Sequence, residues 1–312
     1  MSQPLAPSSQ LWQARAHAKV NLHLGVGEAR EDGFHELATV FQALEVHDIV
    51  SYRWSEDTTV EVTGRHAQGV PATTDNLAWR AVELVAQRLM LPATGILTME
   101  KNIPAAGGMA GGSGDAPAAL LLANRALSTE FSREPVTEEK LFELAAELGS
   151  DVPFTLLGGT ALGRGRGELL TSMMSRGRYI WAIITNAEGL STPTVFHKLD
   201  ELRAAGRGSS PHLDTEAVSQ ALISGNPREL AAAMHNDLQP AALSLRPDLR
   251  KILDTGEAAG ALKGIVSGSG PTCAFLCEDE ETAAEVVAQV CADNRGTRGL
   301  VTTGPASGAT LV

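Results

Sequence analysis

Residues Ile103–Leu122 read IPAAGGMAGGSGDAPAALLL, a glycine-rich turn that runs directly into a stretch of good helix formers. Four glycines stand within six positions of this turn: Gly107, Gly108, Gly111 and Gly112. Such a turn lets backbone N–H groups and the positive end of a helix dipole converge on one anion, typically a phosphate. The stretch therefore predicts a turn and helix that bind the phosphates of a nucleotide.

The glycine spacing excludes the two commonest phosphate-binding motifs. No lysine follows the glycines as the Walker pattern requires, and the spacing does not fit Gly-x-Gly-x-x-Gly. A flexible surface connector is the alternative, but it would more often carry Ser, Asn and Asp among its glycines. The apolar residues Ala105, Ala106, Met109 and Ala110 instead indicate a packed turn, which favours the phosphate site.

Composition indicates a globular protein with room for two domains. The chain has 312 residues, of which 43% are hydrophobic and 20% charged, so it can bury a sizeable core. Its net charge of -12 argues against nucleic acid or an anionic membrane as a partner. The three cysteines fit no zinc spacing, and their low number suggests a reducing compartment.

The N-terminal residues MSQPLAPSSQ lack the basic start and apolar stretch of a signal peptide. We interpret residues 1–10 as a disordered leader and expect a cytoplasmic protein. No apolar run reaches the roughly 18 residues that a membrane-spanning helix needs, so no membrane partner is expected.

The segment Trp12–Val26 alternates apolar and polar residues, the period of a strand with one buried face. Its polar face carries His17, Lys19, Asn21 and His23. Scattered polar residues usually form a solvated face, whereas a cluster of this kind is equally compatible with a functional site.

The rest of the chain mixes strands and helices in both halves. Strands are expected at 34–46, 49–54, 58–62, 95–101 and 179–185, over a glycine-turned pair at 264–277, and near residue 300. Helices are expected at 76–90 (capped by Asp75 or Thr74), from the glycine turn to about 127, at 137–149 and at 280–292, with two or three more between 214 and 259. This order indicates an α+β fold rather than a regular βαβ repeat.

The stretch Ser150-Asp151-Val152-Pro153 has two interpretations. An Asp just before a Pro in the first helical turn is an ordinary N-cap, and the spacing alone favours that structural role. A catalytic carboxylate is the other possibility.

Four motifs together resemble the GHMP kinase superfamily in their order and spacing, and the resemblance covers nearly the whole chain. They are AKVNL (18–22), the glycine turn, LGSDVPF (148–154) and SGSGPT (267–272). The resemblance implies the two-domain GHMP kinase fold, with a ribosomal protein S5 domain 2-like N-terminal domain and a ferredoxin-like C-terminal domain. We expect an ATP-binding domain over residues 11–163 and a substrate domain over residues 164–312.

Other segments resemble the members of the superfamily whose acceptor is a small molecule carrying cytidine diphosphate. They are Gly33-Phe34-His35, LSTPTVF (190–196) and HNDLQPAA (235–242). The resemblance implies that His35 hydrogen-bonds the cytosine while Phe34 and Phe196 stack on it. Stacking contributes about 1–3 kcal/mol per base, and directed hydrogen bonds supply base identity.

The resemblance also implies how the phosphoryl group is transferred. Asp151 would be the general base that accepts the hydroxyl proton, and Lys19 would hold Asp151 ionised and orient the hydroxyl. Asn21 would position the acceptor end of the substrate, and Thr192 would contact the substrate as well.

ATP and Mg²⁺ are the implied cofactors. The turn would hold the β- and γ-phosphates through its backbone N–H groups, with Mg²⁺ bridging them and its protein ligands left unassigned. Asn76 and Lys101 match positions that line the adenine pocket of the family. The nucleotide-binding residues are therefore expected to be Asn76, Lys101, Pro104, Ala105, Ala106, Gly107, Gly108, Met109, Ala110, Gly111, Gly112, Ser113 and Asp115.

Three departures from the family pattern bear on these expectations. Ala106 and Ala110 replace frequent glycines, so these positions are expected not to need a positive φ. Asp115 replaces a frequent Asn and has two possible roles, one favouring the helix dipole and one coordinating Mg²⁺. Phe34 replaces a frequent Tyr and loses one polar contact without losing the stacking.

Two alternatives remain at this point. Another small-molecule kinase of the superfamily, such as homoserine kinase, would share the turn and the fold without needing the aromatic and histidine cytosine site. A catalytically inactive nucleotide-binding module is disfavoured because both Lys19 and Asp151 are present. A monomer and a homodimer are equally compatible with the sequence.

Overall fold

The structure is a computed structural model that describes residues 10–31, 33–104, 107–186 and 188–312. Residues 1–9 of the expected leader lie outside these ranges, and so do Ala105 and Ala106 of the predicted phosphate site.

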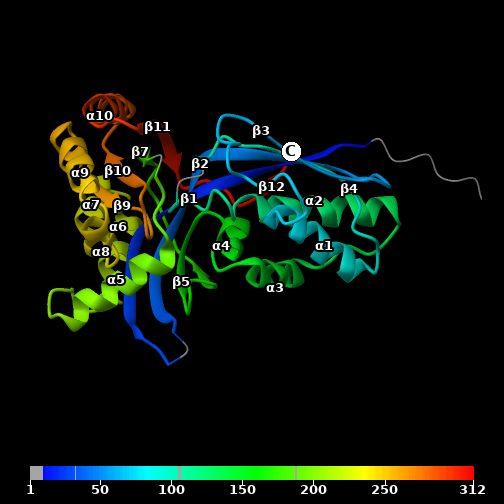
Figure 1. The fold of residues 1–312 in the computed structure, drawn as a ribbon, viewed down its shortest axis with the longest axis horizontal. Coiled ribbons are helices and arrows are strands. Elements are labelled where there is room, and N and C mark those ends of the chain that lie inside the picture. The colour runs from blue at the N-terminus through cyan, green and yellow to red at the C-terminus, as the bar shows by residue number, and fades with distance from the viewer. Residues whose placement is uncertain (1–9, 32, 105–106, 187) are drawn as a thin grey trace, which may run out of the picture.

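Two long antiparallel strands, β1 (Trp12–Ala29) and β2 (His35–Arg53), form the axis of the molecule (Figure 1). They belong to an eight-stranded sheet with a main order of β12-β1-β2-β4-β3. Its other strands are β3 (Thr58–Thr63), β4 (Gly95–Glu100), β5 (Thr160–Arg164) and β6 (Leu169–Ser172), with β8 (His235–Asn236) and β12 (Thr310–Leu311). Strand β5 pairs with β2, β6 with β5, and β8 lies parallel to β1.

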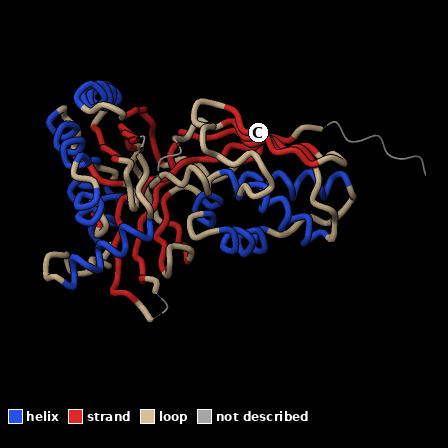
Figure 2. The backbone as a smooth tube through the Cα atoms, in the orientation of Figure 1, coloured by secondary structure: helices blue, strands red, loops and turns tan. Residues whose placement is uncertain are grey.

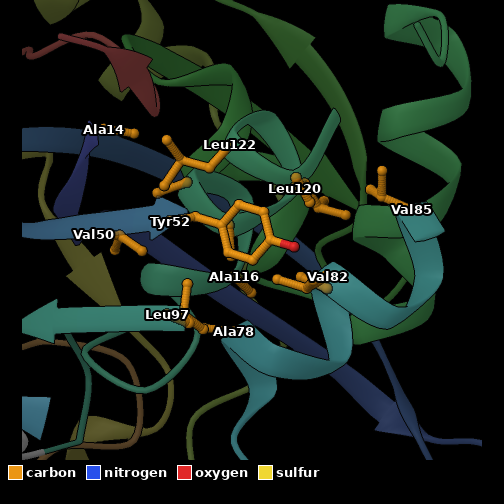
Figure 3. Close-up of a cluster of buried hydrophobic side chains, with 14 of the residues drawn as sticks. Ala14, Val50, Tyr52, Ala78, Val82, Val85, Leu97, Ala116, Leu120 and Leu122 are labelled. Atoms are coloured by element: carbon orange, nitrogen blue, oxygen red, sulfur yellow. The ribbon is translucent and has the colours of Figure 1, made fainter. Parts of the chain in front are cut away.

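Four helices pack beside the half of this sheet that holds β3, β4 and β12 (Figure 1). They are α1 (Leu77–Leu89), α2 (Asp115–Glu130), α3 (Glu138–Leu148) and α4 (Val152–Leu157). In Figure 3, Tyr52 of β2 lies between side chains of α1 and α2, including Val82 and Leu120. Its hydroxyl donates to the carbonyl of Thr94 at 2.6 Å, so the ring is buried with its polar atom paired. Each fully buried Val or Leu here contributes roughly 1.5–3 kcal/mol, which holds the glycine turn at the start of α2 firmly against the sheet.

A second, four-stranded antiparallel sheet has the order β11-β7-β10-β9. Its strands are β7 (Tyr179–Asn186), β9 (Lys263–Val266), β10 (Cys273–Cys277) and β11 (Thr297–Gly304). The helices of this half are α5 (Thr192–Ala204), α6 (Glu216–Ser224), α7 (Pro227–Ala233), α8 (Gln239–Leu245), α9 (Asp248–Ala258) and α10 (Glu280–Asp293). They gather at the opposite end of the molecule from α1–α3 (Figure 2). Helices and antiparallel strands in both halves confirm the expected α+β class.

The two sheets meet along β1 and β2. Ala18, Val20 and Leu22 of β1 share one hydrophobic core with Trp181 and Ile183 of β7. The indole N–H of Trp181 also donates to the side-chain oxygen of Gln42 at 3.2 Å. The apolar residues in the middle of β1 therefore pack on the second sheet, and Lys19 and Asn21 between them face the other way.

Several local expectations need correction. The two strands expected at 34–46 and 49–54 form one continuous strand, β2, and residues 214–259 contain four helices rather than two or three. Asn76, not Asp75 or Thr74, caps α1, because its side-chain oxygen accepts from the Ala78 N–H at 2.9 Å. The polar face of β1 is not solvated, since Lys19 and Asn21 are only 4% and 3% exposed.

Candidate active site

A cavity of about 820 Å³ lies where β1, β2, the start of α4 and helix α5 converge. Strand β2 contributes every second residue from its beginning: His35, Leu37, Thr39 and Phe41. The cavity also brings together the predicted residues Lys19, Asn21, Phe34, Gly108, Asp151, Thr192 and Phe196. Side chains from both halves of the sequence thus face one space of small-molecule size.

Lys19 lies at the centre of the polar part of this cavity. Its ammonium is 3.8 Å from the Asp151 carboxylate and donates to the Asn21 side-chain oxygen at 2.8 Å. The Asn21 amide donates in turn to the Thr39 hydroxyl at 2.8 Å, and Thr39 donates to the carbonyl of His23. This chain of contacts fixes the orientation of Lys19 and Asn21 before any ligand arrives.

Only two of the four polar residues predicted on the first strand line the cavity. His17 contacts the carbonyl of Leu44 through Nδ1 at 3.0 Å, and His23 contacts the carbonyl of His212 through Nε2 at 2.9 Å. Burial lowers the pKa of His23 to about 4, so this ring is neutral at physiological pH. The strand pairing shifts register between His17 and Ala18 and again between Asn21 and His23, and such shifts interrupt the regular alternation of β1.

Asp151 occupies the N-cap position of α4, but its side chain does not cap the helix. It precedes α4 with φ -84° and ψ -17°, a helical conformation, and its side chain accepts no capping hydrogen bond. The carboxylate is 37% exposed and lines the cavity beside Lys19. The N-cap interpretation therefore holds for the position of Asp151 in the chain but not for its side chain, and the carboxylate is accessible for chemistry.

The glycine turn packs against the SGSGPT segment from the second half of the chain. The Ser267 hydroxyl donates to the carbonyl of Gly108 at 2.7 Å. A Cβ on Gly108, which has φ +100°, would lie 2.2 Å from the carbonyl oxygen of Ser267, so no larger residue fits. Ala110 has φ +58°, which contradicts the expectation that this alanine avoids a positive φ. Its side chain is small, and the tight packing of the turn outweighs the local conformational cost.

Beneath the turn lies a buried ionic cluster of Asp48, Lys101 and Asp115. The Lys101 ammonium contacts both carboxylates, at 2.5 Å from Asp115, and donates to the carbonyl of Gly111 at 2.9 Å. Burial raises the pKa of Asp115 to about 7, although the Lys101 charge opposes that shift. Burial alone would lower the pKa of Lys101, but the charges of Asp115 and Asp48 outweigh it and raise that pKa.

Two predicted adenine-pocket residues have structural contacts. Lys101 is fully buried in the ionic cluster, and Asn76 caps α1 while its amide donates to the carbonyl of Pro71 at 2.7 Å. The Asp115 carboxylate lies in the first turn of α2, where the positive end of the helix dipole stabilises a negative charge. Pro104 and Met109 are buried, whereas Ser113 at the end of the turn is half-buried.

Aromatic and histidine side chains form the other end of the cavity. The His35 and Phe196 rings lie 5.1 Å apart, and His35 Nε2 is 2.9 Å from the Asp200 carboxylate. Phe34 is 49% exposed, with the Arg166 guanidinium 4.8 Å from its ring centre. Thr192 shares a 2.9 Å hydrogen bond with Ser269 at the first turn of α5.

Thr39, Asp200 and Ser269 are among the polar residues of this cavity that sequence reasoning missed. Thr39 could have been found from alternation along β2, since it lies two positions from Leu37 and Phe41. Asp200 lies four residues after Phe196 on α5, a spacing that puts both side chains on one helix face. Ser269 belongs to a quoted motif, but its contact with Thr192 depends on tertiary structure.

Comparison with known protein families shows which family has these features. The family model for the GHMP kinases N terminal domain matches residues 76–159, and that for the GHMP kinases C terminal matches residues 218–296. The chain belongs to the GHMP kinase family. Membership confirms the expected fold and makes ATP the expected phosphate donor for a small-molecule acceptor.

Two curated relatives of this GHMP kinase bear the same name. The 4-diphosphocytidyl-2-C-methyl-D-erythritol kinase of Corynebacterium diphtheriae is 51% identical, over 95% of this chain and 96% of that protein. The protein of the same name from Mycolicibacterium smegmatis is 48% identical, over 96% of this chain and 91% of its own length.

Solved structures agree with this grouping. The crystal structure of a 4-(cytidine 5'-diphospho)-2C-methyl-D-erythritol kinase matches this GHMP kinase with a TM-score of 0.74 and 31% identity, covering 93% of this chain and 98% of that one. A homoserine kinase from Cytophaga hutchinsonii matches with a TM-score of 0.69 and 17% identity over the full length of both chains, which is a likeness of fold alone. Among the described residues, no helix has the length and apolar character to cross a membrane.

Proposed function

We propose that this GHMP kinase phosphorylates 4-diphosphocytidyl-2-C-methyl-D-erythritol at its 2-hydroxyl, giving the 2-phosphate and ADP. This reaction is a step of the non-mevalonate, or methylerythritol phosphate, route to isoprenoid precursors. The observation that carries the proposal is a single cavity with Lys19 and Asp151 at one end and His35 and Phe196 at the other. Relatives about 50% identical over nearly the whole chain bear the same enzyme name, which supports it further.

Asp151 is the proposed general base. Its carboxylate accepts the proton of the tertiary hydroxyl as the oxygen attacks the γ-phosphorus of ATP and the bond to the β-phosphate oxygen breaks. Lys19, at 3.8 Å from that carboxylate, stabilises negative charge on the reacting oxygens and keeps the hydroxyl in line. Asn21 receives one hydrogen bond from Lys19 and donates another to Thr39, so its side chain is fixed in place. This fixed amide orients the end of the substrate that carries the reacting hydroxyl.

The glycine turn is the proposed site of the ATP phosphates, with its backbone N–H groups and the start of α2 as the anion donors. Oxygen atoms suit Mg²⁺, and the half-buried Ser113 of this turn offers a hydroxyl oxygen that would hold it. Asp115 contacts Lys101 through Oδ2, and we assign this carboxylate to stabilising the turn and the start of α2; its buried Oδ1 has no hydrogen-bond partner among the described residues. When bound, Mg²⁺ neutralises charge on the phosphates.

Cytosine recognition is proposed for His35, Phe34 and Phe196, with Thr192 contacting the substrate beside them. The half-exposed Phe34 ring and the Phe196 ring offer apolar faces for stacking, and His35 offers directed hydrogen bonds. Homoserine kinase would have no use for this second end of the cavity.

A substrate panel with ATP and Mg²⁺ tests the proposal. The purified protein is assayed for ADP release with the cytidylyl substrate, with homoserine and with mevalonate as acceptors. We expect turnover of the cytidylyl substrate alone. Equal or faster turnover of homoserine would overturn the assignment, and binding of ATP without turnover of any acceptor would favour the inactive module.

We also propose that the protein is cytoplasmic and is a monomer or a homodimer. We propose no nucleic-acid or membrane partner. The division into residues 11–163 for ATP and 164–312 for the substrate is proposed with it.

A further inference from the structure

The His35 side chain is held by two residues of one helix. Phe196 and Asp200 lie four positions apart on α5, so both project from the same face of that helix. Phe196 contacts the imidazole ring at 5.1 Å between centres, and Asp200 Oδ1 lies 2.9 Å from Nε2. His35 is 7% exposed, so its ring has little freedom to turn away from these partners.

Helix α5 is itself anchored along its length. Thr192 at its start is hydrogen-bonded to Ser269, and Arg203 near its end donates to the carbonyls of Gly27 at 2.9 Å and Val26 at 2.8 Å. Arg203 also lies 3.5 Å from the buried Asp237 carboxylate. The position of Asp200 therefore follows from a helix fixed to β1 and to the SGSGPT segment, rather than from a mobile surface side chain.

The contact with Asp200 determines which nitrogen of His35 carries the proton. An ionised carboxylate has only acceptor sites, so the hydrogen of this bond belongs to Nε2. In a neutral imidazole the remaining nitrogen, Nδ1, then presents a lone pair and accepts hydrogen bonds. A base with an amino group at its edge satisfies such an acceptor, whereas a carbonyl oxygen at the same place meets a second lone pair.

We propose that Asp200 is a positioning residue for base recognition, which holds His35 in the Nε2–H tautomer and thereby favours cytosine, with its amino group, over uracil, with its carbonyl. The inference rests on the proposed function, because it assigns the base selectivity of the same cavity. Asp200 touches His35 and acts through it.

The decisive experiment compares binding of CDP and UDP, without ATP, to the wild type and to Asp200→Asn by calorimetry. The asparagine keeps the size of the side chain but can donate through its amide, so both tautomers of His35 become available. We expect the wild type to prefer CDP by about tenfold or more and Asp200→Asn to reduce that preference to about threefold or less. Glu201→Gln, on the exposed side of the same helix, is the matched control and keeps the wild-type preference.

The ¹⁵N chemical shifts of the imidazole give a second readout that a merely structural role would not move. They report the Nε2–H tautomer in the wild type and a mixture in Asp200→Asn, while the thermal midpoint verifies that the variant is folded. An unchanged CDP preference in folded Asp200→Asn would overturn the role of Asp200 and leave the proposed function intact. Equal wild-type affinity for CDP and UDP would overturn the cytosine site itself.

Discussion

The ammonium of Lys19 and the carboxylate of Asp151 lie 3.8 Å apart, although one belongs to the first strand and the other precedes the fourth helix. Lys19 is 4% exposed and already bound to Asn21, whereas Asp151 is 37% exposed. The buried partner is therefore oriented in advance, and the carboxylate beside it remains open to a hydroxyl group. Lys19 can therefore act as a fixed positive charge, and Asp151 as an accessible base.

Asp151→Asn is expected to lower kcat by at least about 10²-fold while ATP binding is retained, because the amide cannot accept the hydroxyl proton. Steady-state ADP release and calorimetric titration with ATP measure the two quantities. Glu147→Gln changes another carboxylate of the cavity wall, to which we assign no part in the reaction, and should be close to wild type. Unchanged turnover in Asp151→Asn would remove Asp151 as the base.

Lys19→Met and Asp151→Asn are expected to be strongly non-additive. Groups that act as one unit lose most of their effect when either is removed, so the double variant should be about as slow as the slower single variant. The measurement is kcat for the four members of the cycle, with thermal midpoints to verify folding. Multiplicative effects would show that the two residues act independently.

His35→Ala is expected to raise the KM for the cytidylyl substrate by about tenfold or more and to leave the KM for ATP unchanged, since His35 lies at the far end of the cavity from the glycine turn. Varying each substrate at saturation of the other separates the two constants. If the KM for the cytidylyl substrate stayed at its wild-type value, the cytosine site would be assigned to the wrong residues.

Gly108→Ala is expected to destabilise the fold by about 1–3 kcal/mol and to raise the KM for ATP. The added methyl meets the Ser267 carbonyl at 2.2 Å, and the glycine has φ +100°. Gly189→Ala, where nothing lies within 4 Å of the added Cβ, serves as the control. Thermal unfolding and ATP titration of both variants test this, and equal thermal midpoints would contradict the close packing of the two segments.

Asp115→Asn is expected to gain stability relative to the wild type as the pH rises from 5 to 8. Burial raises the pKa of Asp115 from its usual value near 3.8 to about 7, so between these values the folded protein holds a proton that the unfolded chain has released. The wild type therefore loses stability as the pH rises from the unfolded-state pKa to the folded-state pKa of Asp115. The asparagine does not titrate, so Asp115→Asn does not lose stability in this way. Thermal midpoints at four pH values measure the difference, with the exposed Asp254→Asn as a charge control. A constant difference across the range would contradict the raised pKa.

Much of the fold could be predicted because local signals carried it. The alternation over Trp12–Val26 identified the first strand, and the helix expected at 280–292 corresponds to α10. Expectations failed where the deciding contacts are distant. The two-residue strands β8 and β12 exist only by pairing with β1. The short helices α7 and α8 each have a proline in the first turn and lie within a segment that periodicity does not divide clearly.

In the candidate site, too, sequence motifs identified individual residues, whereas the contacts between distant residues could not be predicted. Lys19, Asp151 and His35 were identified through motifs, and their meeting in one cavity depends on tertiary structure. The buried cluster around Lys101 was not foreseen, because nothing in the sequence indicates that Asp48 lies beside Asp115. The domain division at residues 163 and 164 and the individual site roles remain predictions.

The contact of Gly108 with Ser267 has a consequence for how such an enzyme can be altered by recombination. The two family models match separate stretches of the chain, yet the backbone of the glycine turn is fitted to a carbonyl of the later stretch. A chimaera that joined the first half of this chain to the second half of a distant relative would inherit both motifs and lose their fit. The glycine turn and the SGSGPT segment therefore form a matched pair, and we expect the two halves of the chain not to be interchangeable.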